Sequence, residues 1–164
     1  MKTMQTVTVA IADADPGRRT KLEQSLRSGE GIKVLTNVMS NGSDASVDRR
    51  HKSRTNMTAI EDMIARVARL NPRILFVNLD QSADEDFALL EALRCECPET
   101  LVVLLTDKSA GDDRIIEALA NGARGCLSHE SDPFYFSKAA HMVDRGEVWV
   151  TRRMLAKIMD KVLH

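Results

Sequence analysis

Short apolar runs alternate with longer segments of helical spacing along the chain. The run from Thr6 to Ala12 (TVTVAIA) alternates apolar and polar residues and is rich in β-branched residues, which is typical of a strand. The runs ILFV at 74–77 and LVVLL at 101–105 are wholly apolar, as expected of strands buried on both faces of a sheet. With IKVLTNV at 32–38 and GCL at 125–127, the pattern predicts five strands.

Segments with helical character separate these predicted strands. Parallel strands need a crossover, normally a right-handed helix, so the alternation predicts an α/β fold in which helices cover both faces of a doubly wound parallel sheet. The predicted helices are Pro16 to Ser28, Thr58 to Leu70, a helix capped by Ser82 and Glu85 that reaches about Arg94, Asp112 to Ala120, and a helix that follows Asp132-Pro133 and ends at Gly146.

Two segments fall outside this alternation. Residues 40–55 are polar, have no apolar period and carry four cationic residues against one acidic residue, Asp48, in their second half, so they are predicted to form a surface loop. A final helix is predicted from Thr151, and its apolar stripe must be buried either against the domain or against a second copy of the chain. The residues of this stripe are Met154, Leu155, Ile158, Met159 and Val162.

Composition narrows the class of protein. The 164 residues, 43% hydrophobic and 29% charged with a net charge of -1, fit one globular domain and exclude a disordered chain or a protein that coats nucleic acid by itself. The apolar runs are far shorter than the ~20 residues of a membrane helix, and no secretory signal begins the chain, so a soluble, cytoplasmic protein is expected. Cys95, Cys97 and Cys126 have no zinc-site spacing and are expected to be reduced core thiols.

Polar residues at the ends of the predicted strands are the candidates for chemistry, because ligands of a doubly wound sheet bind beyond the carboxyl ends of its strands. The turn ADADPGRR after the first strand carries two carboxylates and lacks the donors that cradle a phosphate, so nucleotide binding is disfavoured. Carboxylate oxygens suit a divalent cation such as Mg²⁺. The candidates are Asp13, Asp15, Asn78, Asp80, Thr106 and His129.

Several stretches resemble the receiver domain of response regulators. These stretches are IADADP (11–16), NPRILFVNLD (71–80), LVVLLT (101–106) and ANGARGCLSHESDP (120–133), and DRGEVWVTRRMLAKIM (144–159) is similar to the linker of LuxR/NarL-type transcription regulators. The resemblance implies a flavodoxin-like, five-stranded sheet of order 2-1-3-4-5 and a role in two-component signal transduction. It also implies a receiver-like domain over 1–146 and a linker helix over 147–164, which would lead to a DNA-binding domain absent from this chain.

The resemblance places the family's metal and phosphorylation positions on residues that only partly match. The acidic pair that holds Mg²⁺ falls on Asp13 and Ala14, with Asp15 displaced by one position, so weak Mg²⁺ binding at Asp13 and Asp15 is expected. The phosphoacceptor aspartate falls on Asn78, whose carboxamide has no anionic oxygen to attack a phosphoryl group.

Of the family's two remaining functional positions, one is changed and one is retained. The lysine that clamps the phosphoryl oxygens falls on His129, a mostly neutral imidazole, whereas the switch hydroxyl is retained as Thr106. Together these positions predict a pseudo-receiver that is not an enzyme, requires no cofactor and acts through protein contacts without phosphorylation. A homodimer or another protein is the expected partner; DNA would be reached only through an output domain, and no membrane is involved.

Alternatives remain open at this stage. In the first alternative, Asp80, two residues beyond Asn78, replaces it as the phosphoacceptor. In the second alternative, the vacated acidic pocket binds a small ligand or a cation. Asn78 can both donate and accept, so it is able to hydrogen-bond Thr106 or His129 and hold one conformation without a phosphate. His129 as a pH sensor, and the basic run Arg49 to Arg54 as a contact to phosphates or an acidic partner, are two further hypotheses.

Overall fold

The five predicted strands form one parallel sheet with the order β2-β1-β3-β4-β5. In this computed structural model, which describes residues 6–13, 15–35, 55–78, 85–107 and 111–163, the doubly wound α/β architecture is therefore confirmed. The strands are β1 (Val7–Ala12), β2 (Ile32–Leu35), β3 (Ile74–Asn78), β4 (Leu101–Thr106) and β5 (Gly125–Ser128).

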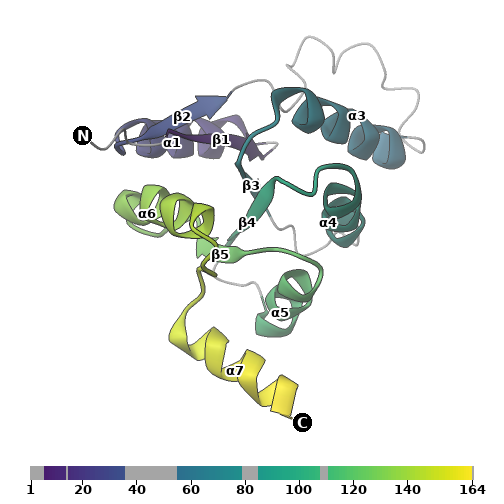
Figure 1. Ribbon diagram of the computed structural model, residues 1–164, viewed down its shortest axis with the longest axis vertical. Coiled ribbons are helices and arrows are strands. Elements are labelled where there is room, and N and C mark those ends of the chain that lie inside the picture. Colours follow the sequence, from purple (N-terminus) through teal and green to yellow (C-terminus); the bar gives the residue numbers. More distant parts are fainter. Residues whose placement is uncertain (1–5, 14, 36–54, 79–84, 108–110, 164) are drawn as a thin grey trace.

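Helices cover both faces of the sheet, and one further helix projects from its edge. Figure 1 shows α1 and α6 on one side of the strands, α3, α4 and α5 on the other, and α7 extending away below β5. This layering follows from the right-handed crossovers that parallel strands require. The helices are α1 (Pro16–Arg27), α3 (Thr55–Leu70), α4 (Glu85–Glu96), α5 (Asp112–Ala120), α6 (Pro133–Asp144) and α7 (Arg152–Leu163).

Among the described residues, the largest difference from the predicted element boundaries is at the start of α3. Helix α3 begins at Thr55 rather than Thr58, because the intervening residues contain no glycine or proline and the helical pattern extends one turn toward the amino end. Strand β2 ends at Leu35 within the described residues. The predicted extension of β2 to Val38, the helix cap at Ser82 and most of the predicted loop at 40–55 lie outside the described residues.

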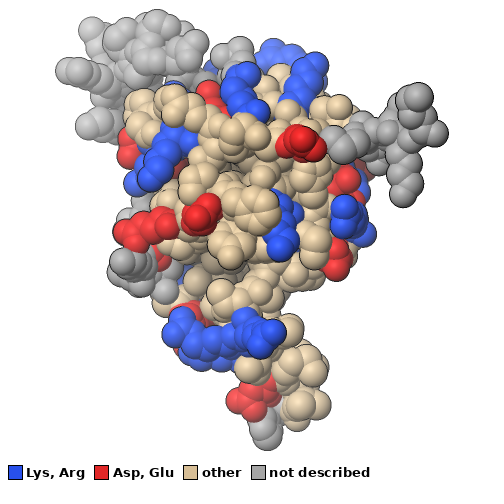
Figure 2. Space-filling model, turned by 90° about the vertical axis from the view of Figure 1, so that its left-hand side faces the viewer, with Lys and Arg blue, Asp and Glu red and all other residues tan. Residues whose placement is uncertain are grey.

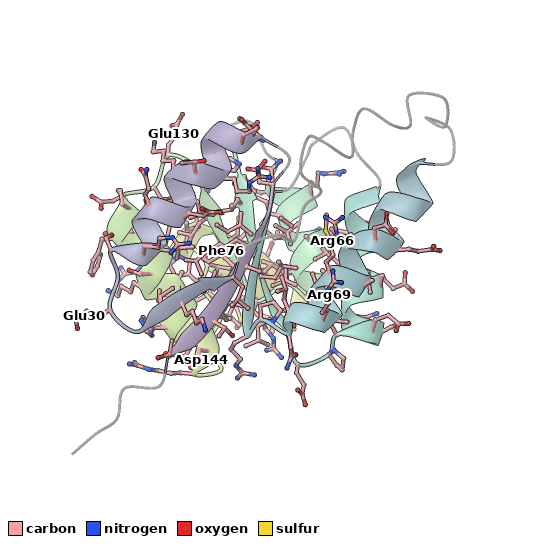
Figure 3. The ribbon with its side chains drawn as sticks, turned by 90° about the horizontal axis from the view of Figure 1, so that it is seen from above. Glu30, Arg66, Arg69, Phe76, Glu130 and Asp144 are labelled. Carbon is pink, nitrogen blue, oxygen red and sulfur yellow. The ribbon has the colours of Figure 1, made fainter. Side chains whose placement is uncertain are left out.

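The alternation of side chains along the strands divides the core into two layers. Phe76 faces α1 and α6, where its ring meets that of Phe136 edge-on, with centroids 6.5 Å apart and planes at 74°. Leu75 and Val77 face the opposite layer, beneath α3, α4 and α5. Figure 3 shows Phe76 at the centre of the sheet, with Glu130 and Asp144 toward its two opposite ends. Most of the remaining core is aliphatic, as the low aromatic content predicts.

The segment between α6 and α7 is attached to the edge of the sheet. Gly146, with a φ of 96°, ends α6 in the left-handed region. Trp149 then forms a bridge with Gly125: the Trp149 N–H donates to the Arg124 carbonyl at 3.0 Å, and the Trp149 carbonyl accepts from the Cys126 N–H at 2.9 Å. A Cβ on Gly125 would lie 3.0 Å from the Trp149 Cβ, so the close approach favours glycine there. The start of α7 is thereby held next to β5.

The structure also tests what the composition predicts about the three cysteines, a metal site and membrane-spanning helices. Cys97 is buried and Cys126 is half-buried, but Cys95 lies within α4 and is exposed, so the prediction of core thiols is wrong for Cys95. Among the described residues, no cluster of three His, Cys, Asp or Glu side chains is arranged to hold a metal ion. No helix in the described ranges combines the length and the apolar character needed to cross a bilayer.

Candidate functional site

Asp13 lies just beyond the carboxyl end of β1, and its side chain is buried. Asp15 caps the start of α1, where its carboxylate accepts from the Gly17 N–H at 3.0 Å, and Pro16 occupies the first helical position. This turn brings Arg18 back over Asp13. The Arg18 Nε donates to Asp13 Oδ2 at 2.9 Å, and Nη2 donates to Oδ1 at 3.0 Å.

The electrostatics of this pair keep both groups charged. Burial raises the pKa of the Asp13 carboxyl, but hydrogen bonds from Arg18 and from the Asp15 N–H, together with the positive charge of Arg18, outweigh it and leave the pKa below its usual value. The hydrogen bond to Asp13 raises the pKa of Arg18 further. The guanidinium therefore already donates to both carboxylate oxygens of Asp13, the atoms through which Asp13 would bind a cation.

Arg18 was not among the predicted site residues. The signal that could have found it is a cationic residue five positions after Asp13, in the first turn of a helix that begins with an acidic cap. Asp15, the second predicted metal ligand, is nearly half exposed and its Oδ2 lies 3.7 Å from the Arg18 Nε. Both predicted cation ligands thus face the same guanidinium, and Mg²⁺ binding at Asp13 and Asp15 stays a prediction.

Asn78 and His129 meet at the ends of β3 and β5. The His129 Nε2 lies 2.6 Å from the Asn78 Oδ1, although 51 residues separate them in the sequence. Because an amide oxygen only accepts, this contact assigns the proton of the neutral imidazole to Nε2. Of the two partners proposed for Asn78 from the sequence, Thr106 and His129, the structure places His129 at hydrogen-bond distance.

The surroundings of His129 favour its neutral form. Burial lowers the pKa of the imidazole, and the positive charge of Arg18 lowers it further, against a smaller opposing effect of the acidic side chains of Asp13, Asp107 and Asp15. At neutral pH the ring is therefore uncharged and able to donate to Asn78. Figure 3 shows the neighbouring Glu130 at the same end of the sheet.

Thr106, the predicted switch residue, ends β4 and is buried. Its hydroxyl lies 3.9 Å from the Cys126 Sγ, and its carbonyl accepts from the His129 N–H at 2.9 Å. Burial raises the pKa of the Cys126 thiol to about 11, so this sulfur is a neutral, weak hydrogen-bonding partner. Thr106 is thus turned toward β5 and the α5 side, whereas Asn78 bonds to His129. Asp80, the alternative acceptor, lies outside the described residues.

The apolar stripe predicted on the final helix is divided by the packing of α7 on α5. Met154 is buried, and Ile158 packs with it against Ile115 and Ile116. Three other members of the stripe are half or more exposed: Leu155 at 51%, Met159 at 52% and Val162 at 76%. The intramolecular contact therefore covers part of the stripe, and the proposed interaction role of the rest stays a prediction.

Ion pairs fasten α7 to the start of α5. Asp112 accepts hydrogen bonds from Lys157 and, at 3.3 Å, from Arg153. The hydrogen bond from Lys157 is the largest cause of the lowered pKa of Asp112, and the positive charges of Arg153 and Lys157 lower this pKa further. Lys161 lies 3.7 Å from Asp113. In the space-filling view, Lys and Arg side chains gather over part of the projecting α7, with uncharged surface beside them (Figure 2).

Solved structures with a similar architecture include receiver domains of response regulators. The isolated REC domain of RcsB from Salmonella enterica serovar Typhimurium in the apo form has a TM-score of 0.70 at 16% identity, over 94% of this chain and 99% of that one. The receiver domain of the response regulator NarL from Mycobacterium tuberculosis has a TM-score of 0.66 at 17% identity, over 87% of this chain and 99% of that one.

A LuxR family DNA-binding response regulator from Silicibacter pomeroyi is also similar, with a TM-score of 0.63 at 17% identity, over 90% of this chain and 98% of that one. No protein-family model matches the chain, and no curated protein matches it. At these identities the likeness shows the fold: the receiver architecture with strand order 2-1-3-4-5 is confirmed.

Proposed function

We propose that this chain is a signal-transduction module of the receiver type that works without phosphorylation, through contacts with other proteins. The observation that carries this proposal is the bond between Asn78 and His129, 2.6 Å long. These residues lie where the resemblance puts the acceptor aspartate and the phosphate-clamping lysine. Here an amide and a neutral imidazole satisfy each other, so residue 78 offers no anionic nucleophile and residue 129 offers no permanent cation.

The Asp13–Arg18 pair supports the same proposal. Acyl-phosphate chemistry on an aspartate relies on a cation that neutralises phosphoryl oxygens. In this chain the buried carboxylate that would hold the cation already has a guanidinium on both oxygens. Binding Mg²⁺ at Asp13 would require this bidentate pair to open, at the cost of leaving a charged side chain without its partner.

The part of the surface proposed to act is the exposed half of the α7 stripe. Leu155, Met159 and Val162 present apolar side chains that the domain itself does not cover. One of the solved relatives of this fold, RcsB, has been seen as dimers bound to DNA. We propose that this chain likewise pairs with a second copy or another protein, and that any contact with DNA is made by an output domain.

The test is phosphorylation in solution. The purified chain is incubated with acetyl phosphate and MgCl₂, and its intact mass is measured. The expected result is no gain of a phosphoryl group, with a phosphorylated conventional receiver as the positive control. A stable gain of one phosphoryl group contradicts the proposal, and repeating the experiment with Asp80→Asn identifies whether Asp80 is the acceptor.

Light scattering at tens of micromolar protein tests the pairing, since a monomeric mass would contradict a homodimer.

A further inference from the structure

An apolar groove lies at the end of the sheet opposite to Asp13 and Asn78. It is bounded by α4, the first residues of β4, the last turn of α5 and one side of α7, and it has a volume of about 650 Å³. Small-molecule sites in proteins typically measure ~300–1,000 Å³ and are lined mainly by apolar side chains. The walls here include Leu93, Ile116, Val148 and Ile158.

The charges around this groove have one sign. Arg94, Arg124 and Lys161 line it, and none of the described residues that line it is acidic. Lys161 forms an ion pair with the exposed Asp113, with 3.7 Å between the Lys161 Nζ and the Asp113 Oδ1. Within the described part of the chain, neither Arg94 nor Arg124 forms an ion pair with an acidic side chain.

Arg94, from α4, lies against the turn that ends α5. Gly122 has a φ of 113°, which favours glycine, and the Arg94 Cδ lies 3.5 Å from the place of a Cβ on it. The aliphatic stem of Arg94 therefore lies against Gly122 in the lining of the groove, and Arg94 as a whole is an exposed residue. An occupant thus meets hydrocarbon at the walls and positive charge beside them.

We propose that this groove binds a small amphipathic anion, a molecule with a hydrocarbon chain and a carboxylate head. The chain would cover apolar walls that now include the exposed side chains of Val148 and Val162, at 53% and 76%. The carboxylate would accept charge-assisted hydrogen bonds from Arg94 and Arg124. A neutral chain would leave these guanidinium groups unpaired, and a cationic head would be repelled.

A ligand in this groove would also act on α7. Ile158, Lys161 and Val162 form one wall, whereas Leu93 and Leu119 belong to the body of the domain. A molecule that contacts both sides stabilises the docked position of α7, because it binds this arrangement better than one in which α7 has moved away. This proposal does not depend on the absence of phosphorylation, since the groove lies at the other end of the sheet.

The first experiment is a calorimetric titration of the whole chain with sodium octanoate, kept below its critical micelle concentration. We expect saturable binding at one site. Decanoate should bind about tenfold more tightly, because each buried methylene contributes ~0.8 kcal/mol. Octan-1-ol and octylammonium chloride carry the same hydrocarbon with a neutral or a cationic head. Binding of either of them as tightly as octanoate would overturn the proposal.

The second experiment tests the two guanidinium groups. The double variant Arg94→Gln/Arg124→Gln should bind octanoate about tenfold more weakly than the wild type, since two charge-assisted contacts are lost. The matched control is Arg27→Gln/Lys33→Gln, which removes the same charge from exposed positions outside the groove. Both variants are expected to unfold at the urea midpoint of the wild type. Equal octanoate affinity in the two variants would overturn the proposal.

Hydrogen exchange locates the site. Octanoate should slow amide exchange in α7 and at the start of β4, and Val162→Asp, at an exposed position of the wall, should weaken both the binding and this protection. Protection confined to the other end of the sheet, around Asp13 and His129, would show that the anion binds elsewhere and would exclude the groove.

Discussion

Arg18 donates hydrogen bonds to both carboxylate oxygens of Asp13, with Nε 2.9 Å from Oδ2 and Nη2 3.0 Å from Oδ1. The side chain of Asp13 is 1% exposed and that of Arg18 is 44% exposed, so the carboxylate is enclosed while the cation reaches solvent. Planar, bidentate pairing of this kind is the strongest form of carboxylate–guanidinium contact. The guanidinium of Arg18, rather than a metal ion, thus neutralises the buried carboxylate of Asp13.

Replacing Arg18 should expose this acid to metal ions. We expect Arg18→Ala to lower the free energy of unfolding by about 1–3 kcal/mol, less than for a fully buried pair because Arg18 is partly exposed. Millimolar MgCl₂ should restore part of this loss in the variant and have little effect on the wild type. Urea unfolding with and without MgCl₂ measures both effects.

The matched control is Lys21→Ala, which removes an exposed cation from the same helix, away from the buried acid. It should change neither the stability nor the response to Mg²⁺ appreciably. A wild-type protein that gains as much stability from MgCl₂ as Arg18→Ala would show that the Asp13–Arg18 pair is no obstacle to a metal ion.

The same pair determines how stability responds to acid. Its hydrogen bonds leave the pKa of Asp13 in the folded protein below that of an ordinary carboxyl, despite burial. The contribution of Asp13 to stability is therefore present above the pKa of the unfolded chain, near 4, and is lost as the pH falls through the lower, folded value. In Arg18→Ala, burial without this partner raises the pKa of Asp13 in the folded protein above that of the unfolded chain, so the ionised carboxylate destabilises the variant and its protonation relieves that cost. The difference in stability between the wild type and Arg18→Ala should therefore become smaller as the pH falls from 7 to 3, which urea midpoints would show.

The sheet could be predicted from the sequence because it depends on local patterns. The runs ILFV and LVVLL are each wholly apolar, and this is the sequence pattern expected of a strand that is buried on both faces. The order of the strands came from the resemblance, since alternation alone is compatible with several orders. The start of α3 was less accurate, because polar residues with no strong period precede it.

The site was predicted less completely, for physical reasons. Side chains at strand ends could be named, but the partner of Asp13 depends on the angle at which α1 leaves its cap, which no spacing rule fixes. The stripe on α7 shows the same limit. Helical period places Met154 and Met159 on one broad apolar face, and only the position of α5 decides that Met154 is buried and Met159 is 52% exposed.

Placing a carboxylate at residue 78 should change the titration of His129. In Asn78→Asp a negative charge replaces the amide oxygen 2.6 Å from Nε2, so the pKa of His129 should rise from below its ordinary value to above it. The charged pair then stabilises the fold below the pKa of the unfolded imidazole, near 6.5, and this gain is lost as the pH rises through the folded pKa. NMR titration of the imidazole protons measures the shift.

A matched control for this substitution is Asn121→Asp, which makes the same change of charge at the end of α5. It should leave the His129 titration unchanged. If Asn78→Asp also leaves it unchanged, the hydrogen bond between residues 78 and 129 is not formed in solution.

The pairing of Phe76 and Phe136 predicts where the core is most sensitive. Phe76→Ala should lower the free energy of unfolding by about 3–5 kcal/mol, because Phe76 is fully buried and its removal leaves a cavity beneath α6. The control is Phe134→Ala in the same helix as Phe136; Phe134 is 62% exposed, so its loss should change stability by no more than about 0.5 kcal/mol. Comparable losses in the two variants would contradict the described packing of the core.

The contact between α5 and α7 depends on Asp112 more than on its neighbour Asp113. Asp112 bonds to Lys157 and Arg153, whereas Asp113 is 92% exposed and lies 3.7 Å from Lys161. Both acids lie in the first turn of α5, so each should interact similarly with its helix dipole, and comparing Asp112→Asn with Asp113→Asn isolates the ion pairs.

Amide hydrogen exchange in α7 should therefore become faster in Asp112→Asn than in Asp113→Asn, while exchange in the sheet stays the same in both. Added salt should reduce the difference, because these pairs are close to the surface. Lys157 holds the pKa of Asp112 below its usual value, so in the wild type the docking of α7 should weaken as the pH falls through that lowered pKa. Equal exchange rates in the two variants at low salt would contradict the larger role of Asp112 in fastening α7.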